Sequence, residues 1–106
     1  MIGRLWRGAT RREDADAYRR FLGEDLLPGL RDIEGFAGAY VLTEDAGDEV
    51  EFVTLTLFES MAAVRAFAGP EPERPVIEPE AQRLLSRVGP RVEHLEVAVA
   101  LGRDPD

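Results

Sequence analysis

The chain has 106 residues, of which 44% are hydrophobic and 32% charged, and this is the size and composition of one compact globular domain. Its formal net charge of -8 repels phosphate backbones and anionic lipids, so we expect neither nucleic acid nor a membrane as its partner. Because cysteine, lysine and asparagine are absent, the sequence excludes disulfides, thiolate metal sites, lysine Schiff bases and asparagine oxyanion donors.

The N-terminal residues predict a strand followed by a capped helix. Residues 2–7 alternate weakly in polarity and stop at Gly8, which is typical of a short strand. Thr10 and Glu13 have the spacing of a capping box, so we expect Thr10 to cap the helix. Apolar residues then recur every three or four positions, which predicts one buried helix face.

The helix is expected to lead into a β-hairpin. Pro28-Gly29 should break or kink the helix, and Gly35 should end what remains of it. Residues 36–43 predict a second strand, and the acidic segment that follows predicts a turn with Gly47 at its tip. Residues 50–58 form the clearest strand in the chain, because they are rich in β-branched and aromatic side chains.

The second half predicts a helix, a long loop and a last strand. Ser60 is placed to cap a short helix over residues 61–69. Four prolines make residues 69–79 an irregular loop, long enough to be a lid over a pocket or an arm that reaches another subunit. Residues 81–88 predict one or two helical turns, and residues 91–99 predict the last strand.

The resulting order, β-α-β-β-α-β, predicts a ferredoxin-like α+β sandwich over residues 1–106, a single domain in which 99–106 form a frayed tail. An antiparallel sheet would have the first and third strands at its centre and both helices on one face. Neither face of the strand 50–58 is clearly polar, so the other face of the sheet also needs a cover. A second copy of the chain covers it most simply, which predicts a homodimer.

Four segments carry a resemblance to a known family: "IGRLWRG", "EGFAGAYVL", "LFESMAAVRAFAG" and "VEHLEV". Together they resemble the antibiotic biosynthesis monooxygenase superfamily, over nearly the whole chain. The resemblance implies a dimeric α/β barrel with a pocket between sheet and helices. Relatives include monooxygenases that need no metal or flavin, haem-degrading enzymes, isomerases and cyclases. The haem-degrading members use an Asn-Trp-His set, which this chain cannot form without asparagine.

The resemblance implies a specific chemistry. An electron-rich phenol, anthrone or hydroquinone loses a proton, and its anion reduces molecular oxygen directly, so the protein supplies a base, oxyanion donors and a dry cavity. We therefore expect a cofactor-independent monooxygenase that acts on an aromatic or polyketide-like small molecule. Two alternatives stay open: a non-catalytic dimeric protein that binds a small apolar ligand, and an isomerase or cyclase that uses the same base.

Five side chains are candidates for the site. His94 is the only histidine and has the ordinary pKa of a general base. If the first and last strands pair with matching faces, His94 meets Arg4 and Trp6 at one mouth of the pocket. Tyr40 could donate to an oxyanion, and Tyr18 could face the same cavity from the helix.

Each candidate also has a purely structural interpretation. His94 could bond to neighbouring backbone or face a partner chain, and Trp6 could anchor the core or the dimer interface. Arg4 could pair across strands with Glu93 or Glu96, and both tyrosines could simply pack. The acidic turn between the second and third strands lacks the spacing of a calcium loop, so we expect no metal site.

The sequence also bears on location. "MIGRLWRGAT" has no long apolar run behind a basic head, so it does not resemble a signal peptide. The longest apolar stretch, "VAVAL", is far too short to span a bilayer. We therefore expect a cytoplasmic protein.

Overall fold

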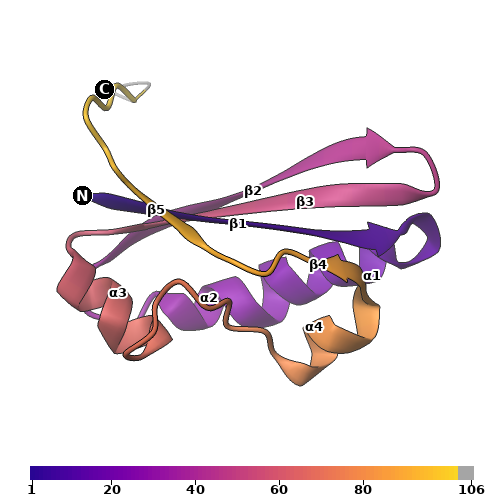
Figure 1. The fold of residues 1–106 in the computed structure, drawn as a ribbon, viewed down its shortest axis with the longest axis horizontal. Coiled ribbons are helices and arrows are strands. Elements are labelled where there is room, and N and C mark those ends of the chain that lie inside the picture. The colour runs from indigo at the N-terminus through magenta and orange to yellow at the C-terminus, as the bar shows by residue number, and fades with distance from the viewer. Residues whose placement is uncertain (103–106) are drawn as a thin grey trace.

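The computed structural model describes residues 1–102, and it has a five-stranded antiparallel sheet with the helices on one side (Figure 1). The strands are β1 (Ile2–Arg11), β2 (Phe36–Ala46), β3 (Glu49–Phe58), β4 (Leu85–Val88) and β5 (Glu93–Glu96). The helical segments are η1 (Arg12–Asp14), α1 (Ala15–Arg20), η2 (Phe21–Leu26), α2 (Leu27–Leu30), α3 (Met61–Ala68) and α4 (Pro79–Leu84). The strand order is β2-β3-β1, with β4 and β5 both beside β1, which confirms the predicted ferredoxin-like α+β fold.

The first strand is longer than the sequence predicts, and this changes the role of Thr10. β1 pairs with β3 along its whole length, from Ile2 opposite Phe58 to Arg11 opposite Glu49. Thr10 therefore lies inside the strand, fully buried and opposite Val50, and it does not cap a helix. The predicted capping box is wrong because the long-range pairing with β3 outweighs a local capping preference.

The helix that follows passes through Pro28-Gly29 and ends at Leu30, so of the predicted break or kink at this site, the break does not occur. The irregularity lies before the proline, in the π-helical segment η2, where the Leu27 N–H donates to the Leu22 carbonyl five residues back. Proline has no N–H to donate to the preceding turn, and a wider turn there gives the carbonyls other partners. Within residues 1–102, no helix has the length and hydropathy that crossing a bilayer requires.

Other predictions in the middle of the chain are confirmed. Gly47 has a φ of +73° in the tight turn between β2 and β3. The Ser60 hydroxyl accepts a hydrogen bond from the Ala63 N–H at 3.1 Å, which caps α3.

The C-terminal part differs from prediction in one element. The expected helical turns over 81–88 are instead the short helix α4 and the strand β4, which pairs with β1 between Gly8 and Thr10. A bulge between Ala9 and Thr10 accommodates this pairing. β5 spans only four residues, and residues 97–102 have no regular secondary structure; the rest of the predicted frayed tail lies outside the described residues.

The core beneath the sheet consists of two clusters. Tyr18, Leu22 and Phe52 belong to one cluster, and Phe58 and Val64 belong to the other. Between Phe52 and Phe58, the helix-facing positions of β3 are Thr54 and Thr56, opposite Trp6 and Arg4 of β1. The candidate site lies next to these two threonines, between the two core clusters.

We expect Gly35→Ala to destabilise the fold. Gly35 has a φ of +89°, and an added Cβ would lie 2.6 Å from the Ala63 Cβ of α3. The combined backbone and steric cost should lower the free energy of unfolding by about 1–3 kcal/mol in urea titrations. Gly29→Ala is the matched control, because its Cβ meets nothing within 4 Å and alanine favours a helix. Equal stability of the two variants would contradict this account.

Candidate functional site

A cavity of about 70 Å³ lies between the sheet and the helical layer. The residues that line it from β1 and β3 are Arg4, Trp6, Thr54 and Thr56. Its other walls are largely apolar and come from helices and the proline-rich loop, and they include Tyr18, Leu22, Leu26, Leu27, Leu30, Phe67, Pro75, Val76, Ile77 and Ala81. An apolar concavity with a few polar groups on one wall is the usual form of a small-molecule site.

The proline-rich loop closes one side of this cavity. Pro75, Val76 and Ile77 line it, and Glu73 anchors the loop by accepting a backbone hydrogen bond from the Val92 N–H at 2.8 Å. The loop therefore covers the pocket of its own chain, as the prediction of a lid requires.

Arg4 joins this loop to the sheet. Its side chain is only 5% exposed and lies with its Cζ 5.6 Å from the centre of the Phe67 ring. Nη1 donates to the Pro72 carbonyl at 2.6 Å, and Nη2 donates to the Arg74 carbonyl at 3.3 Å. The predicted alternative, an ion pair with Glu93 or Glu96, does not form: no carboxylate of residues 1–102 lies within 4 Å of the guanidinium nitrogens.

His94 lies opposite Arg4 in the pairing of β1 with β5, and its Nε2 is 2.9 Å from Arg4 Nη1. Arginine only donates hydrogen bonds, so Nε2 accepts this bond and the neutral ring carries its proton on Nδ1. His94 is half-buried but does not line the cavity itself. It bonds to Arg4, which does line the cavity. His94 therefore lies on the same face of the sheet as Arg4, which is the arrangement that its role as a base requires. Its Nε2 lone pair, however, already accepts the hydrogen bond from Arg4.

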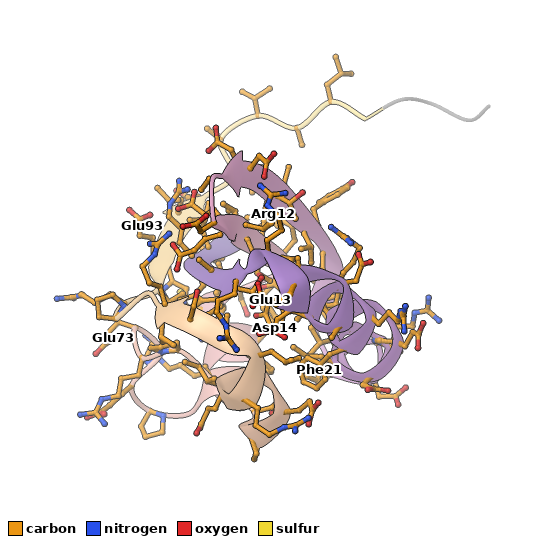
Figure 2. The ribbon with its side chains drawn as sticks, turned by 90° about the vertical axis from the view of Figure 1, so that its right-hand side faces the viewer. Arg12, Glu13, Asp14, Phe21, Glu73 and Glu93 are labelled. Atoms are coloured by element: carbon orange, nitrogen blue, oxygen red, sulfur yellow. The ribbon has the colours of Figure 1, made fainter. Side chains whose placement is uncertain are left out.

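The surroundings of His94 lower its pKa. Burial of the ring is the largest cause, the positive charge of Arg4 adds to it, and the Glu73 carboxylate opposes both. In Figure 2, Glu73 lies toward the helices and Glu93, the first residue of β5, lies at the sheet. His94 is therefore held in its neutral form near neutral pH.

Trp6 forms the centre of the sheet wall, in a fixed orientation. Its Nε1 donates to the Gly89 carbonyl at 2.7 Å. A Cβ on Gly8 would lie 2.6 Å from the Trp6 ring, so glycine at this position leaves room for the indole against its own strand. Trp6 is thus a pocket wall, which was one of its two predicted roles.

The two candidate tyrosines lie on opposite sides of the sheet. Tyr18 lines the cavity from α1, packs edge-on against Phe52, and burial raises the pKa of its hydroxyl to about 12, so it remains a neutral donor. Tyr40 faces the other side of the sheet with 63% of its side chain exposed, and it cannot line this cavity within one chain. Period-two alternation fixed the face that Tyr40 shares with its neighbours but not which face the helices cover.

The threonines at the cavity floor and the contact of Phe67 with Arg4 were not predicted from the sequence. A signal was present: large apolar side chains at Phe52 and Phe58 flank two smaller polar ones on the same face. Where small polar side chains stand between large apolar ones on the helix-facing side of a strand, the core is not filled. Within residues 1–102 there is no group of three histidine, aspartate or glutamate side chains that could hold a metal ion.

Comparisons with known proteins support the fold. No protein-family model matches the sequence, and no curated protein matches it. Among solved structures, a protein of unknown function from Nitrosomonas europaea is 20% identical with a TM-score of 0.70, covering 97% of this chain and 94% of its own.

Two further structures are each 18% identical with a TM-score of 0.63. One is a Bacillus cereus protein described provisionally as an antibiotic biosynthesis monooxygenase, covering 94% of this chain and 97% of its own. The other is Rv0793 from Mycobacterium tuberculosis, covering 95% and 98% respectively. At these identities the likeness shows a shared fold.

An NMR titration of His94, the only histidine, tests its environment. We expect a pKa below 6.5 that rises in Arg4→Gln, which removes the neighbouring charge, and falls further in Glu73→Gln. Because the folded-state pKa is the lower one, the unfolded chain binds more protons between the two values. The His94 contribution to stability is therefore complete above pH 6.5 and is lost as the pH falls through the folded pKa. A measured pKa at or above 6.5 would contradict this assignment.

Proposed function

We propose that this protein is a cofactor-independent monooxygenase that oxidises a small aromatic or polyketide-like molecule in the cavity beneath its sheet. The observation that carries this proposal is the cavity itself: apolar walls around a floor that presents Arg4, Trp6 and, through Arg4, His94. The shared fold with a protein described provisionally as an antibiotic biosynthesis monooxygenase agrees with it.

The proposed roles of the site residues use the contacts of Arg4. A substrate hydroxyl that reaches Arg4 competes for the N–H now bound to His94 Nε2, and the freed lone pair accepts the substrate proton. Arg4 then faces the oxyanion, while Trp6 and Tyr18 position the ring system. His94 is the proposed catalytic base in this scheme.

The oxygen chemistry needs no external reductant. The substrate carbanion or phenolate transfers one electron to O₂, and the resulting radical and superoxide combine into a carbon-bound peroxide. Loss of water from the protonated peroxide converts a CH₂ group into C=O, so one oxygen atom enters the product and the other leaves as H₂O. The apolar walls limit side reactions of the peroxide with water.

A homodimer completes the proposal. Leu5 and Leu55 are paired neighbours on the sheet face that no helix covers, and Tyr40 lies beside Leu55. Leu42 and Leu95 on this face are 52% and 54% exposed. A continuous apolar surface of this kind favours association, and a second copy would present the same surface.

A non-catalytic binding protein is the second candidate function. It is favoured by one observation: the Nε2 lone pair of His94 is already bound to Arg4, and His94 does not line the cavity. In that case the same pocket holds a small apolar ligand without removing a proton from it.

Oxygen uptake distinguishes these candidates. We expect the protein to consume O₂ with a panel of anthrones and hydroquinones, and His94→Gln to slow the reaction by roughly 10²–10⁴-fold. Arg20→Gln, on the exposed side of α1, should not change the rate. Binding that changes the fluorescence of Trp6 without oxygen uptake supports the non-catalytic protein, and turnover without oxygen uptake supports an isomerase or cyclase.

Light scattering after gel filtration tests the dimer. We expect the wild-type protein to have twice the chain mass of 11.8 kDa. Leu55→Glu places a charge at the centre of the open face and should give monomers. Ala62→Glu, on an exposed position of α3, introduces the same side chain and should leave the dimer intact. A wild-type protein of single-chain mass would refute the dimer.

A further inference from the structure

Arg4 is a buried cation without a buried anion. Every arginine in an ion pair within residues 1–102 is at least half-exposed, whereas Arg4 is 5% exposed and pairs with no carboxylate. Charged side chains that are buried to this extent are normally paired, because an uncompensated charge in a low-dielectric site is costly. Burial lowers the pKa of Arg4, and this agrees with a guanidinium that lacks a compensating charge.

The partners of Arg4 are all neutral. Two backbone carbonyls and the His94 ring accept hydrogen bonds from it, and these occupy both hydrogens of Nη1 and one of Nη2. The N–H of Nε and the second N–H of Nη2 have no acceptor among the described residues. Nε and Nη2 form the edge of a guanidinium that can bind two oxygens of one carboxylate side by side.

The surroundings of this cation suit an aromatic ligand. Arg4 lies over Phe67, and both line the cavity together with Trp6, which shares the Arg4 face of β1. Glu78 also lines the cavity, but it is exposed and lies more than 4 Å from the guanidinium nitrogens. Apolar walls strengthen the attraction between Arg4 and an anion, because there is little water to screen it.

We propose that the cavity is specific for a small aromatic carboxylate, whose two oxygens bind Arg4 while its ring lies beside Trp6 and Phe67. This inference rests on the ligand pocket of the proposed function and names the charge of the molecule that it accepts. An apolar cavity of roughly 150 Å³ holds one benzene ring. The present cavity of about 70 Å³ therefore has to widen when it binds, and we expect residues 75–78, which line it outside any helix or strand, to be displaced.

The test compares two probes with the same ring and different charge, benzoate and benzamide. Trp6 is the only tryptophan and lines the cavity, so its fluorescence reports binding of either probe. We expect benzoate to bind the wild-type protein at least about tenfold more tightly than benzamide, and the preference to weaken at high ionic strength. Arg4→Gln should remove the preference, Arg4→Lys should keep part of it, and Arg20→Gln should leave it unchanged.

The outcomes separate the two proposals. Equal affinity for benzoate and benzamide overturns the anion site and leaves a neutral-ligand pocket intact. Binding of neither probe, together with oxygen uptake on a hydroquinone, also overturns the anion site while the proposed reaction stands. Binding of neither probe without any oxygen uptake overturns both. Because Arg4 also holds the loop, circular dichroism must show that its variants fold; if they do not, the wild-type comparison and its salt dependence decide the matter.

Discussion

The pocket depends on a gap in the core that β3 itself creates. The helix-facing side of this strand runs from Phe52 through Thr54 and Thr56 to Phe58. The two phenylalanines are completely buried, and each belongs to one of the two core clusters. The threonines between them are smaller and carry a hydroxyl that needs a hydrogen-bond partner. The Thr56 hydroxyl finds one in the Arg4 carbonyl at 3.4 Å. The cavity is the space that the two clusters leave between them.

Arg4 then connects three parts of the chain that are far apart in sequence. It lies on β1, bonds to the loop 68 and 70 residues further on, and bonds to β5 at a separation of 90 residues. The conformation of the loop and the proton on His94 therefore both depend on one guanidinium. A ligand that engages Arg4 changes the environment of His94 at the same time, which couples binding to the availability of the proposed base.

Much of the architecture could be predicted because its determinants are local. The β-branched run of β3, the glycine at position 47 and the Ser60 cap each depend on neighbouring residues only, and each is confirmed. The predictions that failed have non-local causes. Thr10 remains in β1 because β3 continues alongside it, and β4 forms because the edge of β1 next to β5 offers unpaired backbone groups.

The sequence by itself determined the types and order of the main elements, the central positions of β1 and β3, and the fact that Arg4 and Trp6 share one strand face. Hydrophobic periodicity predicts the elements and the faces of each strand, and the order of the elements predicts which strands are central. Only the tertiary structure decided that the helices cover the Arg4 face rather than the Tyr40 face, and that Arg4 bonds to the His94 ring. Alternation places residues on two faces without saying which is covered, and the register of strands 90 residues apart depends on how the whole chain packs.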